Sequence, residues 1–228
     1  MTLNFAFLDR FWFMFVDGTR ITLMLAVLTV VFGTILGVLI ALLRLSKRWY
    51  LRFPAQAYIE FLRGTPMLVQ IMFIFYALPQ LGIRIPHVPM FGPDFPRFAS
   101  GIIALSMNSG AYVAEIIRAG IQAVDKGQTE AARSLGMGHI LTMRKIVLPQ
   151  AFRNILPALG NEFVTIIKES SIVSVIGIGE LMFRTQTVFG NTFRVFESLI
   201  ICALIYFALT FTTSRLVGLM ERRLRAGD

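Results

Sequence analysis

Charged and chemically reactive residues are scarce in this chain of 228 residues. Only 15% of the residues are charged, whereas soluble domains usually carry about 25%. The single cysteine, Cys202, excludes a disulfide framework and a cysteine metal site. The two histidines, His87 and His139, fall in predicted loops, and the H-E-x-x-H and G-x-S-x-G patterns are both missing. We therefore expect no catalytic residue, no metal site and no cofactor.

The chain also has no G-x-x-x-x-G-K-[ST] segment. That pattern builds the loop whose backbone N–H groups cradle the phosphates of ATP. The chain therefore cannot form the nucleotide site of an ATPase, and any ATP-driven activity needs a second polypeptide.

What the sequence does contain is a series of long apolar runs. Hydrophobic residues make up 56% of the chain, and the mean hydropathy is +0.70. Several runs approach the roughly 20 apolar residues that cross a bilayer as a helix. A net charge of +9 could indicate nucleic acid, but the basic residues cluster at the ends of the apolar runs, as in membrane proteins. We expect an all-α integral membrane protein with lipid, and no nucleic acid, as its partner.

Five apolar runs predict five transmembrane helices. They cover residues 19–43, 54–78, 98–123, 151–176 and 194–219. The predicted five-span domain is thus 19–220, with a long basic loop at 124–149 and a basic tail at 221–228. The other two loops are 79–97, which holds five prolines, and 177–193, which is rich in glycine and polar residues.

The first 18 residues are rich in aromatic side chains but also carry Asp9, Arg10 and Asp17. We expect this segment to lie at the membrane interface, because it is too short and too charged to span. It lacks a small-residue cleavage site, so we do not expect a cleavable signal peptide.

The distribution of arginine and lysine predicts the orientation. Loop 44–53 has four, segment 118–153 has six and the tail from Arg215 has four, which makes 14 on one side against six on the other. Basic residues accumulate on the cytoplasmic side. The sequence therefore predicts an external N-terminus, with the 124–149 loop and the C-terminus in the cytoplasm.

Three consecutive predicted spans each carry a polar face at helical spacing. The residues of these three faces are Glu60, Arg63, Met67 and Gln70 in the second span, Asn108, Tyr112 and Glu115 in the third, and Asn161, Glu162, Thr165, Lys168 and Glu169 in the fourth. Charges at membrane depth usually face a bundle interior or a wet cavity, so we expect the three faces to converge on a pathway. Structural ion pairs and snorkelling side chains are the alternative explanation. Four acids against two bases predict a cavity that prefers a cationic or neutral solute.

The longest basic interval contains a compact helix–turn–helix pattern. Glu130, Ala131, Ala132 and Leu135 predict a short helix, which Gly136 and Gly138 end. A second amphipathic run follows from Ile140, and Pro149 suits the first turn of the next helix. We expect a projecting knob here in place of an extended linker.

This knob resembles the E-A-A loop of permease subunits of ABC importers. The family pattern is E-A-A, three residues, G, nine residues and I-x-L-P, and it is matched by Glu130-Ala131-Ala132, Gly136 and 146–149 with both gaps at the family length. The resemblance implies a type I ABC importer permease fold with a cytoplasmic coupling helix. It also implies that Glu130, Ala131, Ala132, Leu135 and Gly136 dock into a cleft of a separate ATPase.

Three further segments are similar to the polar amino acid branch of these permeases. They are R-G-T-P at 63–66, N-S-G-A-Y at 108–112, and G-N-E-F at 160–163 followed by K-E-S-S at 168–171. The resemblance implies a substrate site within the membrane, between helices of two permease subunits. The residues carried over to it are Arg63, Thr65, Asn108, Tyr112, Asn161 and Glu162, with Arg63 matching a carboxylate and the last two suited to an amino group.

The predicted function is a permease subunit of an ATP-driven polar amino acid importer in the bacterial inner membrane. Its implied partners are two ATPase subunits, a second permease subunit that is identical or paralogous, and an external amino acid-binding protein. A self-contained ion-coupled carrier or channel remains the alternative, although five spans without an internal repeat are unusual for secondary carriers. A membrane scaffold without a pathway is a third possibility, which the polar faces disfavour.

Overall fold

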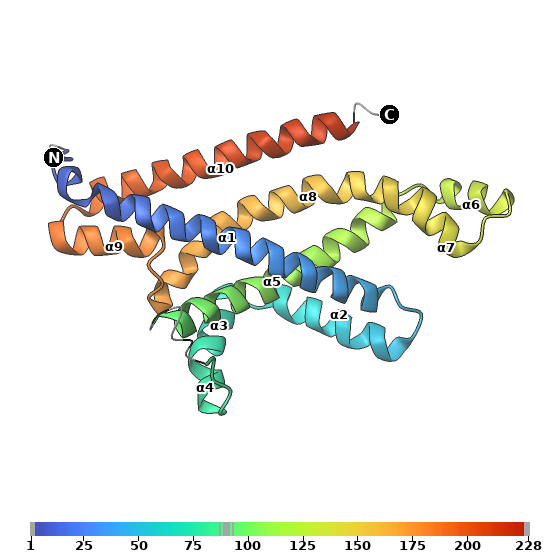
Figure 1. Cartoon of the computed structure of the whole chain (residues 1–228), viewed down its shortest axis with the longest axis horizontal. Helices are drawn as coiled ribbons and strands as arrows, with labels where there is room; N and C mark the ends of the chain where they lie inside the picture. The colour runs from blue at the N-terminus through green and yellow to red at the C-terminus, as the bar shows by residue number, and fades with distance from the viewer. Residues whose placement is uncertain (1–2, 87, 89–91, 93, 226–228) are drawn as a thin grey trace.

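The computed structural model describes residues 3–86, 88, 92 and 94–225, and all regular elements in this part of the chain are helices, as predicted. The bundle is built from α1 (Leu8–Arg44), α5 (Phe95–Gln122), α8 (Leu148–Glu169) and α10 (Val195–Arg225). The N-terminus and α9 (Leu181–Thr192) lie at one end of the bundle, and the 124–149 segment projects from the other (Figure 1). His87, which was predicted to lie in a loop, and residues 226–228 of the predicted basic tail lie outside the described residues.

Three helices are long and apolar enough to cross a membrane, namely α1, α5 and α10 up to Leu224. A fourth span is present if the bent pair of α2 (Trp49–Gly64) with Met67–Gln80 counts as one. The fourth predicted span is α8, which is not among these candidates; its polar residues include Arg153, Asn161 and Glu162. Length and composition therefore give three or four spans, and the predicted count of five is not confirmed.

The first helix has no break at residue 18. It runs without interruption over 37 residues, about 55 Å at a rise of 1.5 Å per residue, and so exceeds a hydrocarbon core of about 30 Å. Gly18 lies inside it and touches the start of α9, because a Cβ at this glycine would come within 2.8 Å of Leu181 Cα. The predicted boundary at residue 18 thus falls inside a continuous helix, and the interfacial location of residues 1–18 stays a prediction.

The second predicted span is broken rather than straight. Helix α2 ends at Gly64 and α3 (Met67–Met72) begins after Pro66, with an angle of 109° between the two parts. Proline disfavours the helical conformation in the residue before it, and Thr65 is extended at φ −115° and ψ 145°. The chain then continues through the π-helical turn η1 (Phe73–Ala77) and α4 (Leu78–Gln80), pointing away from the bundle (Figure 1).

Two predicted loops contain more helix than expected. Helix α5 begins at Phe95, three residues early, because Pro96 occupies its first turn, where a missing N–H costs nothing. After α8 the chain forms the 3-10 segment η4 (Ser170–Ile176) and then α9, which takes up most of the predicted 177–193 loop. Glycine at 177 permits the left-handed turn between them, at φ +78°.

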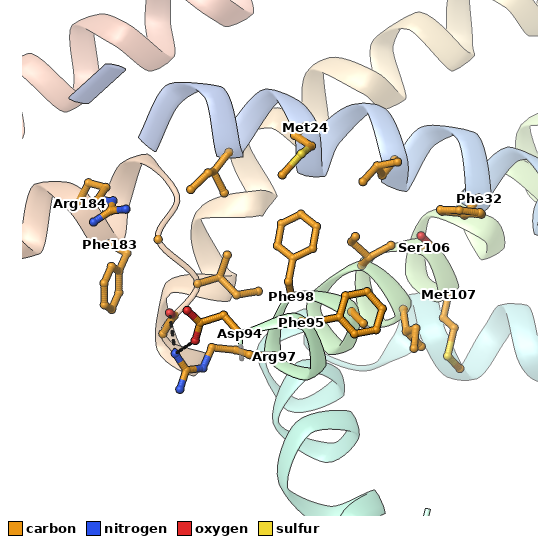
Figure 2. A pocket seen from close by; sticks show the side chains of 18 of the residues that line it. Met24, Phe32, Asp94, Phe95, Arg97, Phe98, Ser106, Met107, Phe183 and Arg184 are labelled. Carbon is orange, nitrogen blue, oxygen red and sulfur yellow. Dashed lines mark hydrogen bonds and ion pairs between the residues drawn. The ribbon is translucent and has the colours of Figure 1, made fainter. Parts of the chain in front are cut away.

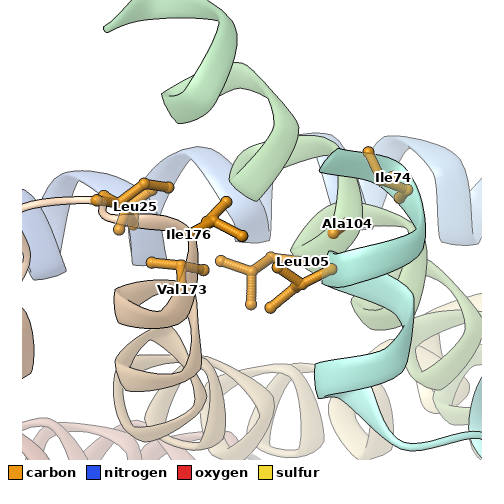
Figure 3. Close-up of a cluster of buried hydrophobic side chains, with 8 residues drawn as sticks. Leu25, Ile74, Ala104, Leu105, Val173 and Ile176 are labelled. Atoms are coloured by element: carbon orange, nitrogen blue, oxygen red, sulfur yellow. The ribbon is translucent and has the colours of Figure 1, made fainter. Parts of the chain in front are cut away.

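The largest part of the core joins the broken second helix to the bundle. The cluster of Leu25, Ile71, Ile74, Ala104, Leu105, Val173, Ile176 and Ile178 packs α1, α3, η1, α5 and η4 together (Figure 3). Close approach also holds α1 on α5, since a Cβ at Gly37 would come within 2.6 Å of Val113. Gly33 and Gly37, which are four positions apart in the sequence, therefore form a small-residue pair at this contact, and close packing of this kind is what joins helices in lipid.

Candidate substrate pathway and coupling surface

A buried amide network fixes the break in the second helix to α5. Asn108 Nδ2 donates to Gln70 Oε1 at 3.0 Å and to the Leu62 carbonyl at 3.3 Å. Gln70 Nε2 donates to the same carbonyl at 2.8 Å and to the Thr65 hydroxyl at 2.9 Å. These bonds satisfy carbonyl groups that the helix break exposes. Asn108 and Thr65, two predicted substrate ligands, thus have their hydrogen bonds committed inside the protein.

Two other predicted ligands lie together beside this network. The guanidinium carbon of Arg63 on α2 sits 5.1 Å from the ring centroid of Tyr112 on α5. Arg63 is exposed and Tyr112 is half-buried, so the stacked pair presents its charge to the outside of this single chain. The polar faces predicted for the second and third spans therefore meet, through the Asn108 network and through this cation–π pair.

The predicted ligands of the fourth span lie on α8, which packs against both α5 and α10. Asn161 is exposed, and Glu162 is half-buried near Ser109 of α5. Within the described residues no hydrogen bond or ion pair joins Asn161 or Glu162 to Arg63. The α8 face thus approaches α5, but the direct contacts join only the faces of the second and third spans.

The charge balance of the predicted cavity differs from the count of four acids and two bases. Glu115 forms an ion pair with Arg44 of α1 at 3.5 Å and a salt bridge with Arg118 of α5. Glu60 is exposed and accepts a hydrogen bond from Gln56 Nε2 at 2.7 Å. Because Arg44 and Arg118 were not in the count, Glu115 adds no net negative charge to this region.

The segment between α5 and α8 forms the expected helix, glycine turn and second helix. Helix α6 (Lys126–Ser134) is capped at its N-terminus by Asp125, whose carboxylate accepts the Gly127 N–H at 2.7 Å. It ends in a Schellman motif: Gly136 N–H donates to the Arg133 carbonyl at 2.9 Å, and Met137 N–H donates to the Ala132 carbonyl at 3.0 Å. After this turn, α7 (His139–Thr142) and the π-helical turn η3 (Met143–Val147) lead directly into α8.

The glycine turn needs glycine at only one of its two positions. Gly136 has φ +78°, a left-handed conformation that side chains other than glycine adopt at a cost. Gly138 has φ −66° and ψ 157°, which any residue adopts. The sequence indicates a turn glycine at both positions, and only the backbone angles show that Gly136 alone requires glycine.

The tip of this projection exposes apolar side chains. Leu135 and Ile140 are each 83% exposed, whereas Ala132 is buried. Glu130 and Ala131 face outward on α6, so four of the five predicted coupling residues are accessible and Ala132 packs inside. Ile140 was predicted only as part of an amphipathic run, yet it adds to the exposed apolar tip. Exposed apolar patches are typical of protein or membrane interaction sites.

Residues 33–226 match the model of the family described as binding-protein-dependent transport system inner membrane component. The chain is 44% identical to a putative glutamine transport system permease protein, GlnP, of Rickettsia bellii, over 92% of each chain. It is 41% identical to the arginine transport system permease protein ArtQ of Bacillus subtilis, over 93% of each. The similarity therefore covers nearly the whole chain and nearly the whole of each relative.

Solved structures give the same result for the fold. A crystal structure of an amino acid ABC transporter with histidines contains a chain that is 48% identical, with a TM-score of 0.90, over 98% of this chain and 100% of that one. A chain of the MetNI methionine ABC transporter in an inward-facing conformation has a TM-score of 0.74 at 17% identity, over 97% and 99% of the two chains. At that identity the second likeness shows the fold alone.

Proposed function

The chain belongs to the family of inner membrane components of binding-protein-dependent transport systems, and from this we propose that it is the permease subunit of an ATP-driven importer of polar amino acids. It is a multi-pass helical membrane protein of the ABC permease fold. The relatives are named as a putative glutamine and an arginine transport system permease protein, and the 48% identical chain comes from an amino acid ABC transporter. These likenesses favour a transport subunit over an ion-coupled carrier, a channel or a scaffold.

The observation that carries the proposal is the exposed apolar tip formed by Leu135 and Ile140 on the projecting α6–α7 knob. Because the chain has no phosphate-binding loop, the energy of ATP must reach it through a contact surface. Helix α6 is held rigidly at both ends, by Asp125 and by the Gly136 turn. The rigid connection from α7 through η3 into α8 would transmit a movement of the knob into the bundle. Two such subunits, each held by an ATPase, would switch between inward-facing and outward-facing states.

We place the substrate beside Arg63, Tyr112, Asn161 and Glu162, the four predicted ligands that keep polar groups accessible. The exposed guanidinium of Arg63 suits the α-carboxylate, since its fork matches two carboxylate oxygens. Glu162 suits the α-amino group or a cationic side chain. Asn108 and Thr65 become positioning residues in this proposal, because they shape the helix break instead of facing the solute.

The proposed orientation puts the N-terminus outside and the knob in the cytoplasm, and the two lie at opposite ends of the bundle (Figure 1). The outer end would then receive an external binding protein. Phe193 supports this, because it is 88% exposed just after α9 and has a left-handed backbone at φ +57°. A strained, exposed aromatic residue is a candidate contact for a partner.

The test is to purify the tagged chain from its native membrane and to identify and assay what accompanies it. The proposal expects an ATPase subunit and, in liposomes, ATP-dependent uptake of a polar amino acid. Gly136→Trp should leave membrane insertion unchanged and remove the ATPase. Full uptake by that variant, or uptake by the purified chain alone without ATP, would overturn the proposal in favour of a self-contained carrier.

The substrate class is tested separately by titrating the assembled complex with arginine, glutamine and aspartate. Glu162→Gln should weaken arginine more than glutamine, because it removes the carboxylate that would face a cation. A complex that prefers aspartate would contradict the assignment of the acidic side chains while leaving the coupling role of the knob intact.

A further inference from the structure

An apolar groove of about 1160 Å³ lies between α1 and α5, beside the start of α9 (Figure 2). None of the predicted substrate ligands lines it. Met24, Leu28 and Phe32 form its α1 side, and Phe98 and Ile103 are prominent on its α5 side. Apart from Ser106, the polar side chains of the lining are Asp94, Arg97 and Arg184. The groove is therefore separate from the proposed substrate pathway.

The charged side chains gather at one end of this groove. Figure 2 shows Asp94 and Arg97 as a pair and Arg184 apart from them on the same side of the groove, whereas Phe32 and Met107 lie on the opposite side. One terminal nitrogen of Arg97 forms an ion pair with Asp94 at 3.2 Å and donates to the Gly177 carbonyl at 3.4 Å, while Arg97 Nε, like Arg184 Nε, is buried without a partner in the described residues. Asp94 and Arg97 balance each other, so Arg184 leaves this end of the groove with one net positive charge.

Arg184 has no ion pair or side-chain hydrogen bond within the part of the chain that the structure describes, and its Nε is buried without a partner. Its guanidinium lies over Gly179, where a Cβ would come within 3.3 Å of Nε. The N–H groups of this half-buried guanidinium have no acceptor among the described residues, so they are free to bind an acceptor from outside the chain. An anionic group of another molecule would therefore bind favourably at this end of the groove.

The length of the groove indicates that its occupant also has a long apolar part. Its α1 wall extends from Ile21 to Leu36, about 22 Å at 1.5 Å per residue. One leaflet of the hydrocarbon core is about 15 Å thick, half of the whole core. An occupant with an anionic head at Arg184 and a long apolar tail along α1 would fill both parts of the groove.

We propose that the groove binds an anionic phospholipid, with its phosphate on Arg184 and one acyl chain between α1 and α5. A guanidinium presents several N–H donors in a plane that matches phosphate oxygens, and it is held here at the outer end of the proposed orientation. A helix from a second copy could cover the apolar wall but would satisfy Arg184 only if it brought a carboxylate to that depth. The site rests on the membrane location of the chain and is independent of the transported solute.

The test measures retained lipid on the assembled complex by native mass spectrometry. After exchange into detergent, the complex is incubated with phosphatidylglycerol or phosphatidylcholine of the same acyl length. We expect one tightly held phosphatidylglycerol per chain. Arg184→Gln should weaken its retention about fivefold, the contribution of one arginine near an anionic headgroup, and should weaken phosphatidylcholine less, because the choline group cancels the charge of its phosphate. The charge-matched control is Arg20→Gln, which removes an exposed arginine of α1 outside the groove and should have no effect.

A second pair of variants tests the acyl part of the site. Ile103 lines the groove and is 41% exposed, so Ile103→Trp should fill the groove and reduce retention of both lipids without disturbing the core. Leu204→Trp, on an exposed position of α10 outside the groove, should not. Equal retention of the two lipids by the wild type, equal effects of the two arginine variants, or displacement of the lipid by inorganic phosphate would each overturn the proposal. So would a disulfide between Ile103→Cys in two copies, since a second copy would then occupy the groove.

Discussion

The side-chain amides of Asn108 and Gln70 are hydrogen-bonded to each other at 3.0 Å, and both donate to the carbonyl of Leu62. This pair joins α5 to the point where the second helix turns by 109°. Backbone carbonyls freed by a helix break must find donors when no water reaches them. The bent geometry of α2 and α3 therefore depends on two polar side chains that would otherwise be expensive in this interior.

Replacing Asn108 with leucine should lower the stability of the protein rather than its affinity for a solute. The change leaves Gln70 Oε1 without a donor, and we expect a loss of about 1–3 kcal/mol. Gln70→Leu should cost a similar amount, and the double variant should cost less than the sum, because the two residues share one network. Thermal unfolding and solute titration of each variant distinguish the outcomes. Unchanged stability with weakened solute binding would show that Asn108 is a direct ligand after all.

The left-handed glycine of the knob provides a matched comparison. A Cβ added at Gly136 or at Gly138 would meet no atom within 4 Å, so neither substitution creates a clash. Gly136→Ala should nevertheless destabilise the turn by about 1–2 kcal/mol, because alanine disfavours a positive φ. Gly138→Ala should be neutral.

The measurement is the amount of ATPase that co-purifies with each variant, together with the rate of ATP hydrolysis that accompanies transport. We expect a clear loss for Gly136→Ala and none for Gly138→Ala. Equal behaviour of the two variants would mean that the shape of the turn does not control docking, and that side-chain contacts at Leu135 and Ile140 do.

The helical class, the knob and the small-residue contact between α1 and α5 could be predicted from the sequence, because each has a local signal. The spacing of Gly33 and Gly37 marks the first contact, and the glycine after the short helix of Glu130, Ala131 and Ala132 marks the Schellman turn. The bend at Thr65 also had a local signal in Pro66, but the long apolar run hid it. Hydropathy measures how apolar a run of residues is, and it does not show whether the helix bends within that run.

The roles of the polar side chains could not be predicted from spacing alone. Helical periodicity placed Asn108, Tyr112 and Glu115 on one face, and it cannot distinguish a group that faces solute from one that satisfies a neighbouring backbone. The ion pair of Glu115 could not be predicted for the same reason, because its partner Arg44 lies in another helix, 71 positions earlier in the chain. Such pairings depend on tertiary packing, which no single-helix pattern contains.

The exposed aromatic at the outer end should affect partner binding without affecting the fold. Phe193 is 88% exposed and has φ +57°, so Phe193→Gly removes a strained conformation and little packing. We expect unchanged or slightly higher thermal stability. If Phe193 contacts the external binding protein, the variant should bind that protein at least tenfold more weakly, as for an aromatic anchor worth more than about 1.4 kcal/mol.

Phe196→Ala, nearby on α10 and also exposed, is the control for general loss of apolar surface. Equal effects of the two changes would remove the specific role of Phe193.

Glu180 should make the stability of the protein depend on pH. This carboxylate is fully buried at the start of α9 and accepts hydrogen bonds from Met182 N–H at 2.8 Å, Phe183 N–H at 2.7 Å and the Tyr206 hydroxyl at 2.8 Å. Burial raises the pKa of the carboxyl above its ordinary value of 4.5, and the hydrogen bonds offset only part of that rise. The folded protein therefore holds this proton more tightly than the unfolded chain does.

Because the folded state binds the proton more tightly, stability from this group is present below pH 4.5 and is lost as the pH rises through the folded pKa. Thermal unfolding between about pH 4 and about pH 8 should show that decline in the wild type. Glu180→Gln keeps one acceptor for the helix start and cannot ionise, so its curve should lack this decline. Asp9→Asn removes an exposed carboxyl near the same end and should leave the slope of the wild type in place. A wild-type curve that rises over this range, or a glutamine variant with the same slope as the wild type, would show that Glu180 is ionised at no net cost in the folded protein.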